Sequence, residues 1–196
     1  TFGEVLLRLT PPGYLKFSQT KSLCATFGGS ETNVAVSLSH FGLKSDFITR
    51  LPQNDIAQSC VMDLRSHGVG TDNIVYGGDR LGLYYFENTA CARAAKVVYD
   101  RANSAFCTID PSMIDWKKVF DGADWFHWSG IAPSLSQSAA DTTKMAIEEA
   151  QKGIRNGHGG PFGSVIVKDE KVKAGLGVDV FGSTRRAAAF SKEIIS

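Results

Sequence analysis

Two adjacent glycines, Gly28 and Gly29, come directly before a helical pattern and limit what this chain can fold into. The apolar residues Val34, Leu38 and Phe41 follow at helical spacing, and a glycine stands where the helix would end. Glycine lets a backbone pass close to a ligand, and the first turn of a helix offers unpaired N–H groups and the positive end of the helix dipole. The pattern therefore predicts a β-to-α turn that forms the entrance of a polar pocket.

Asn33 stands one turn into this predicted helix, and its side chain is expected to point back toward the entrance. An amide offers both a donor and an acceptor to a polar ligand. A simpler interpretation is that the glycines form only a tight connection and that Ser30 caps the helix. Composition alone does not decide between the two.

Strand and helix signals alternate along the first part of the chain. Residues 5–9 and 47–50 have the pattern of short strands, and a second helix is expected over residues 55–67. This alternation is typical of a parallel sheet covered by helices, so the predicted fold class is α/β with a mostly parallel sheet flanked by helices. The apolar face of the second helix is expected to consist of Ile56, Cys60 and Leu64.

Two stretches, near residues 12–26 and 80–100, are rich in β-forming residues and less buried in pattern than a core strand. They predict a small β-sheet that lies outside the main core. Because a small sheet with exposed apolar edges favours edge-to-edge pairing, this sheet also predicts a homodimer.

The last predicted elements lie between residues 112 and 152. Ser112 is expected to cap a short helix over residues 115–119, and residues 125–131 have the pattern of an apolar strand. We interpret His127, inside that strand, as a core histidine rather than a proton carrier. Residues 136–152 are rich in good helix formers and predict a covering helix.

Composition narrows the class of protein. A chain of 196 residues with 43% hydrophobic residues can bury a real core, and its net charge of +1 gives no reason to expect nucleic acid or a membrane as a partner. No stretch has the pattern of a secretion signal or the length to span a bilayer, so we expect a cytoplasmic protein. Four widely spaced cysteines without a Cys-x-x-Cys pair argue against a zinc site or a disulfide framework: Cys24, Cys60, Cys91 and Cys107.

Residues 28–35, Gly-Gly-Ser-Glu-Thr-Asn-Val-Ala, resemble the first signature of the ribokinase-like (PfkB) sugar kinases, a glycine pair followed by a spacer and Asn-x-Ala. Residues 1–11 resemble the opening strand of the 2-keto-3-deoxygluconate kinase branch. The resemblance covers about residues 1–152 and implies the N-terminal, sugar-binding part of a kinase domain, including a small β-sheet lid. Residues 153–196 are left as an atypical C-terminal segment of uncertain placement.

The resemblance also implies a substrate site. Tyr84 stands where this branch carries a sugar-facing tyrosine, and Arg101 where it carries an arginine that reaches the substrate carboxylate. A planar guanidinium can hold a carboxylate by two parallel hydrogen bonds, although a surface arginine after a strand is the simpler interpretation. The implied substrate-binding residues are Gly28, Gly29, Asn33, Tyr84 and Arg101.

ATP and magnesium are the cofactors that the resemblance implies. The family's Gly-Ala-Gly-Asp motif, whose aspartate takes the proton from the sugar hydroxyl, does not occur in this sequence. The nearest stretch, residues 178–185, puts Thr184 and Arg185 where a glycine and the aspartate belong, and an arginine stays protonated. We therefore assign no catalytic residue and expect an incomplete nucleotide site.

Residues 159–172 resemble a different structure, the first hairpin of the cytidine and guanine deaminase fold. Those enzymes hold zinc with His-x-Glu and Pro-Cys-x-x-Cys, and no Cys or His follows His158. A plain β-hairpin with residues 168–171 as its polar turn is the other interpretation.

The sequence thus leaves more than one function open. The first is a sugar kinase, or its sugar-binding part, that transfers the ATP γ-phosphate to an acid sugar such as 2-keto-3-deoxygluconate. The second is a sugar-binding or interaction module without transfer activity. A deaminase-like hydrolase remains only if another chain supplies its metal ligands.

Overall fold

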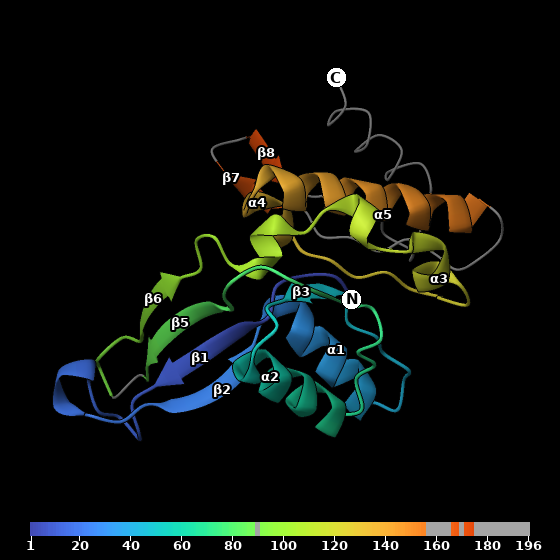
Figure 1. Ribbon diagram of the computed structural model, residues 1–196. Helices are drawn as coiled ribbons and strands as arrows, with labels where there is room; N and C mark the ends of the chain where they lie inside the picture. Colours follow the sequence, from blue (N-terminus) through green and yellow to red (C-terminus); the bar gives the residue numbers. More distant parts are fainter. Residues whose placement is uncertain (89–90, 156–165, 169–170, 175–196) are drawn as a thin grey trace.

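The computed structural model describes residues 1–88, 91–155, 166–168 and 171–174. In Figure 1, helices lie on both sides of a central layer of short strands, and a four-stranded sheet projects from one end of the molecule. The predicted α/β class is confirmed.

Parallel pairing holds the central layer together. Strands β3 (Thr49–Leu51) and β4 (Ile74–Tyr76) pair in parallel. Isolated parallel bridges join Phe2 to Ile48 and to Trp128. The layer therefore contains the chain start, the segment before β3, β4 and the segment around residue 128.

Hydrophobic side chains cover this layer on both faces. Phe47 and Ile48 are successive residues and point to opposite faces, as strand geometry requires. Phe47 packs in the cluster that includes residues of α1 (Ser30–His40) and α2 (Asp55–Ser66). Ile48 packs in the cluster that includes residues of α5 (Gln137–Arg155). The sheet is thus a middle layer between two helical layers.

The projecting sheet, which we call the lid, contains four strands in the order β2-β1-β5-β6. Its outer pairs are antiparallel and its central pair, β1 with β5, is parallel, so the larger sheet of the molecule is mixed rather than parallel. Its strands are β1 (Leu6–Thr10), β2 (Cys24–Gly28), β5 (Gly82–Glu87) and β6 (Lys96–Asp100).

The first strand differs from its prediction. The sequence suggested a buried core strand over residues 5–9, but only Val5 and Leu6 are buried there, and residues 7–10 are half-buried. The reason is that the chain leaves the central layer near Leu6 and enters the lid.

Two helices bury different faces from those predicted. In α1 the buried side chains are Glu31, Thr32 and Ala35, while Phe41 just beyond the helix is 80% exposed. In α2 the buried face contains Cys60 and Leu64 as predicted, but Ile56 is 49% exposed. The other two members of the buried face of α2 are Ala57 and Val61.

The segment between the lid and α5 is less regular than predicted. Ser112 lies in a short 3-10 helix (Pro111–Met113), and the cap of α3 (Trp116–Phe120) is Asp115 instead. The strand predicted over residues 125–131 contributes only the bridge at Trp128, because the chain turns into α4 (Ile131–Ser134). Two further 3-10 helices are η1 (Phe17–Gln19) and η2 (Ala105–Thr108).

The predicted hairpin in the C-terminal segment is present as two antiparallel strands, β7 (Ile166–Lys168) and β8 (Lys171–Ala174). Residues 178–185, the stretch nearest in sequence to the Gly-Ala-Gly-Asp motif, lie outside the described residues. Within the part of the chain that the structure describes, no helix is long and apolar enough to cross a membrane.

Candidate functional site

The end of β2 and the start of α1 bring three of the predicted site residues together. Gly28 ends β2, and a Cβ atom at this position would lie 3.4 Å from Tyr84 Oη and 3.8 Å from Asn33 Oδ1. Asn33 is exposed and Tyr84 is half-buried. The missing side chain of Gly28 therefore leaves a space that a phenol and an amide face from two elements.

Gly29 has a different environment. It is the N-cap of α1, and no side chain caps this helix, so Ser30 is the first helical residue and not the cap. A Cβ atom at Gly29 would collide with the backbone carbonyl oxygen of Glu4. The predicted tight connection is therefore present, and it directly follows Gly28, where a Cβ atom would fit in ordinary contact.

One face of the lid carries a row of three polar side chains. Arg8 on β1 is directly opposite Tyr84 on β5, which is directly opposite Tyr99 on β6, so the three side chains lie on the same face. The rings of Tyr84 and Tyr99 are 6.0 Å apart between centroids. Sequence reasoning missed Tyr99, although its two-residue spacing from Arg101 was a usable signal.

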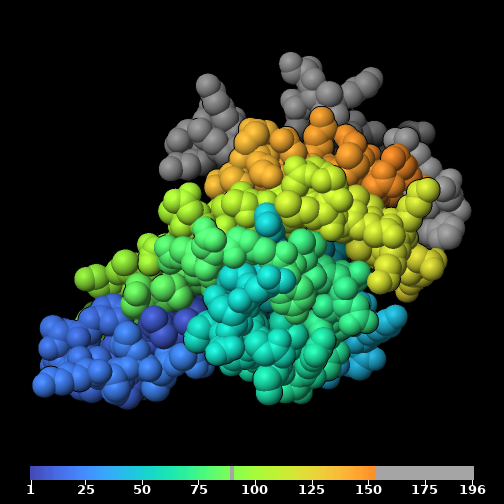
Figure 2. All heavy atoms as spheres, viewed as in Figure 1, coloured from blue at the N-terminus to red at the C-terminus, as the bar shows by residue number. Residues whose placement is uncertain are grey.

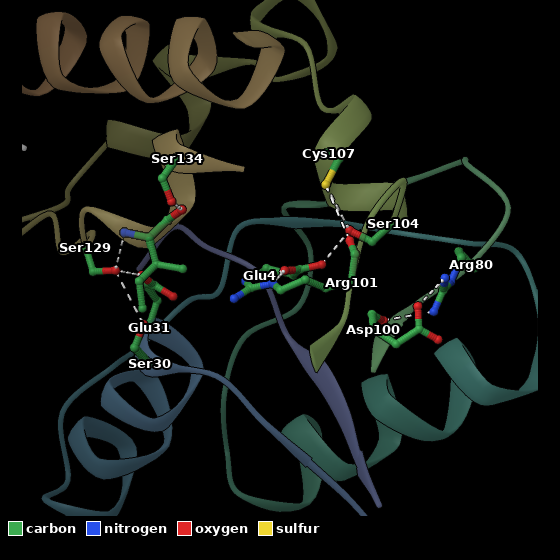
Figure 3. Close-up of polar contacts among 11 residues, drawn as sticks. Glu4, Ser30, Glu31, Arg80, Asp100, Arg101, Ser104, Cys107, Ser129 and Ser134 are labelled. Atoms are coloured by element: carbon green, nitrogen blue, oxygen red, sulfur yellow. Dashed lines mark hydrogen bonds and ion pairs between the residues drawn. The ribbon is translucent and has the colours of Figure 1, made fainter. Parts of the chain in front are cut away.

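Arg101 follows β6 and lies at the base of the lid. Its Nε donates to Glu4 Oε2 at 2.8 Å, and its Nη2 contacts the same oxygen (Figure 3). The guanidinium carbon lies 5.7 Å from the ring centroid of Tyr99. Because its side chain is only 20% exposed and paired with a carboxylate, Arg101 is not a solvated surface arginine.

Glu4 is the partner that the sequence reasoning did not identify. Its side chain is 3% exposed, and its second oxygen, Oε1, accepts a hydrogen bond from Ser104 Oγ. Cys107 Sγ lies 3.3 Å from the same serine oxygen. The sequence does contain a signal for this pairing: Glu4 stands within the apolar run around residues 2–6. Because buried carboxylates are rare unless they are paired, its position predicts a partner.

A second polar cluster lies on the other side of the α1 N-terminus. Glu31 is 2% exposed and accepts a hydrogen bond from Ser129 Oγ, which also accepts from the backbone N–H of Ile131 at 3.2 Å. Ser30 Oγ lies 3.4 Å from the same hydroxyl. Figure 3 shows this cluster apart from the Glu4 cluster. The Glu31 cluster therefore holds the turn before α4 and not the base of the lid.

His127 lies near this second cluster. It is half-buried, and burial lowers the pKa of its imidazole below the ordinary value of 6.5, although the carboxylate of Glu31 opposes this change. The imidazole is therefore mostly neutral at pH 7.

Side chains that could bind a metal do not gather in the described part of the chain. No group of three or more His, Cys, Asp or Glu side chains there could hold a metal ion. Cys24, Cys60, Cys91 and Cys107 are free thiols. The polar groups described above are hydroxyl, amide and guanidinium groups.

Comparison with known proteins gives these groups a context. A family model described as pfkB family carbohydrate kinase matches residues 2–165. The 2-dehydro-3-deoxygalactonokinase of Haloferax volcanii is 35% identical over 151 residues, which are 76% of this chain and 47% of that protein. The 2-dehydro-3-deoxygluconokinase of Thermoproteus tenax is 27% identical over 154 residues, which cover 76% and 46% of the two chains.

Solved structures agree with these sequence matches. The crystal structure of 2-dehydro-3-deoxygluconokinase from Thermotoga maritima superposes with a TM-score of 0.76 at 44% identity, and the match covers 77% of this chain and 46% of that one. A putative 2-keto-3-deoxygluconate kinase from Enterococcus faecalis gives a TM-score of 0.75 at 32% identity, covering 82% and 46%. The chain spans about half the length of the relatives that it matches. Its sequence and its fold make this chain a member of the pfkB family of carbohydrate kinases.

Proposed function

We propose that this chain is the sugar-binding part of a kinase that transfers the γ-phosphate of ATP to a 2-keto-3-deoxy sugar acid. The observation that carries the proposal is the space at Gly28, which Tyr84 Oη and Asn33 Oδ1 both face. The names of the relatives support a sugar acid as substrate. In this proposal residues 1–152 form the sugar-binding part, and residues 153–196 are a separate segment.

Each predicted site residue has a chemical role in this proposal. The amide of Asn33 and the hydroxyl of Tyr84 exchange hydrogen bonds with sugar hydroxyl groups, while Gly28 and Gly29 let the sugar approach the backbone. Arg101 binds the carboxylate of the acid sugar through charge-assisted hydrogen bonds. Four of these residues would therefore hold any sugar, and Arg101 would select an acid.

ATP and magnesium complete the proposed reaction. Magnesium would neutralise charge on the phosphates during transfer. Since the described residues contain no cluster of metal ligands, we assign no residue of this chain to the ion. The lid is proposed to close over the sugar and to pair with a second lid in a homodimer.

The alternative function is a sugar-binding or interaction module without transfer activity. It uses the same sugar-binding groups, and no residue of the chain has been assigned to phosphate transfer. Transfer of labelled phosphate from ATP to 2-keto-3-deoxygluconate, measured beside calorimetric binding of the same sugar, separates the two. Transfer supports the kinase, and binding without transfer supports the module.

Replacement of Arg101 by alanine tests the sugar-acid assignment. We expect Arg101→Ala to weaken 2-keto-3-deoxygluconate binding by about 1.5–3 kcal/mol, which is roughly ten- to a hundredfold in Kd, because a hydrogen bond to a charged group is lost. The affinity for fructose, a neutral ketose, should change much less. Asn33→Ala is the matched control and should weaken both sugars similarly. Equal affinity of wild type and Arg101→Ala for the acid would contradict the assignment.

A further inference from the structure

The carboxylate of Glu4 lies where three strands of the lid meet the body of the molecule. Glu4 stands two residues before β1, Gly82 is the first residue of β5, and Arg101 directly follows β6. A Cβ atom at Gly82 would lie 2.6 Å from Glu4 Oε1 and 3.3 Å from Arg101 Cβ, so the three backbones approach closely around this carboxylate. Glu4 therefore lies at the base of the lid.

Both oxygens of this carboxylate are occupied by protein donors. Oε2 accepts from Nε and Nη2 of Arg101, and Oε1 accepts from the hydroxyl of Ser104 (Figure 3). Glu4 is 3% exposed in its side chain, and Ser104 is 1% exposed. A buried carboxylate is tolerated when it is paired and fully hydrogen-bonded, which is the arrangement here.

This arrangement fixes the direction of the arginine. A guanidinium is planar and carries five N–H donors, and Glu4 uses two of them, one on Nε and one on Nη2. Among the described residues, Nη1 of Arg101 has no recorded acceptor. Because the guanidinium is rigid, the contact of Glu4 with its Nε and Nη2 side also fixes the direction of its Nη1 and Nη2 side. That second side can donate two parallel hydrogen bonds to another carboxylate.

From these contacts we infer that Glu4 is a positioning residue: it aims Arg101 at the carboxylate of the bound sugar acid. Ser104 supports it by holding the other carboxylate oxygen. The inference rests on the proposed function in its assignment of Arg101 to the ligand carboxylate. It adds that selectivity for acid sugars depends on a buried residue that does not touch the ligand.

Glu4→Gln provides the test, because it keeps the side-chain size and removes one oxygen acceptor and the charge. We expect the Kd for 2-keto-3-deoxygluconate to rise roughly tenfold, and the Kd for fructose to change less than about twofold. A merely structural role would weaken both sugars together. Unchanged or tighter binding of the acid would overturn the inference, because Glu4 would then be neutral or a competitor for Arg101.

A matched control lies at the base of the same lid. Asp100 forms an exposed ion pair with Arg80 at 2.9 Å, and their side chains are 47% and 36% exposed. Asp100→Asn removes a carboxylate next to Arg101 but leaves Glu4 in place, so both sugar affinities should stay as in wild type. If this variant loses acid binding as Glu4→Gln does, charge near the lid base decides affinity and the inference is wrong.

A measurement without ligand separates this inference from the proposed function. In the wild type, the Nε–H proton of Arg101 should give a protected arginine signal in nitrogen-15 NMR, and Glu4→Gln should lose it while Asp100→Asn retains it. If wild type binds no acid sugar, the proposed function fails. An unprotected Nε–H in wild type overturns the positioning role itself. Should Glu4→Gln not fold, Ser104→Ala replaces it, with an expected loss of acid affinity of about threefold.

Discussion

A side chain would meet different surroundings at Gly28 and at Gly29. Alanine substitution at each position tests whether the glycine serves ligand binding or the fold. A Cβ at Gly28 would lie 3.4 Å from Tyr84 Oη and 3.8 Å from Asn33 Oδ1, which are ordinary contacts, whereas one at Gly29 would collide with the Glu4 carbonyl. We expect Gly28→Ala to keep the stability of the fold and to weaken sugar binding. Gly29→Ala should lower the free energy of unfolding by about 1–3 kcal/mol, because overpacking forces the backbone to shift.

Thermal unfolding and calorimetric titration with 2-keto-3-deoxygluconate check this pair of glycine variants. Each variant is the control for the other, since they add the same methyl group one residue apart. Wild-type affinity in Gly28→Ala would mean that the ligand does not use the space at this glycine. A wild-type melting temperature in Gly29→Ala would mean that the connection can relax.

At the scale of the element, α1 and α2 begin in contrasting ways. The N-terminus of α1 has no side-chain cap, while Asn54 Oδ1 caps α2 by accepting from the N–H of Ala57 at 2.9 Å. Asn54→Ala should therefore lower the free energy of unfolding by about 1 kcal/mol. Sugar affinity should not change, because α2 contains none of the predicted site residues.

Asn54→Asp is the control for this cap, since an aspartate also caps a helix and is favoured by the helix dipole. Chemical denaturation of the three proteins measures the difference. If Asn54→Ala is as stable as Asn54→Asp, tertiary packing of Cys60 and Leu64 holds α2 without its cap.

Elements with strong local signals were predicted well from the sequence. The two helices α1 and α2 end where glycines follow, at Gly42 and Gly68, which both adopt positive φ. Residues 125–131 failed as a predicted strand because apolar composition alone does not ensure pairing partners. Trp125 is 55% exposed, and only Trp128 makes a ladder contact.

At the scale of the whole molecule, the exposed edge of the lid leads us to predict pairing with a second copy of the chain. β6 is an edge strand whose five residues are all exposed, and Val98 is 44% exposed. Figure 2 shows the lid standing out from the rest of the described surface. Unpaired edge strands favour pairing with another strand, so we expect a homodimer in solution.

Light scattering during gel filtration measures this dimer. Val98→Arg places a charge on the edge strand, on the face opposite to Tyr99, and should shift the mass to that of a monomer. Lys117→Glu on α3, away from the lid, is a control that should leave the dimer intact. A monomeric wild type, or a dimeric Val98→Arg, would contradict pairing through β6.

Long-range contacts explain why part of the site escaped sequence reasoning. Gly28 and Asn33 lie within one short motif, so a local pattern is enough to group them. Glu4 meets Arg101 and Ser104 across separations of 97 and 100 residues. A repeating pattern within a short stretch of sequence cannot indicate a contact over such a separation. Only the structure shows that Arg101 has the buried partner Glu4.

The order of the lid strands has a consequence for how this protein can be divided. Strands β1 and β2 come before α1, while β5 and β6 come after β4, so α1, β3, α2 and β4 are inserted between the two halves of the lid. The lid is therefore not a module that can be excised or transplanted with one cut at each end. The connections from β1 to β2 and from β5 to β6 each stay within one half of the lid, so an insertion in either would enlarge the lid without interrupting the central layer.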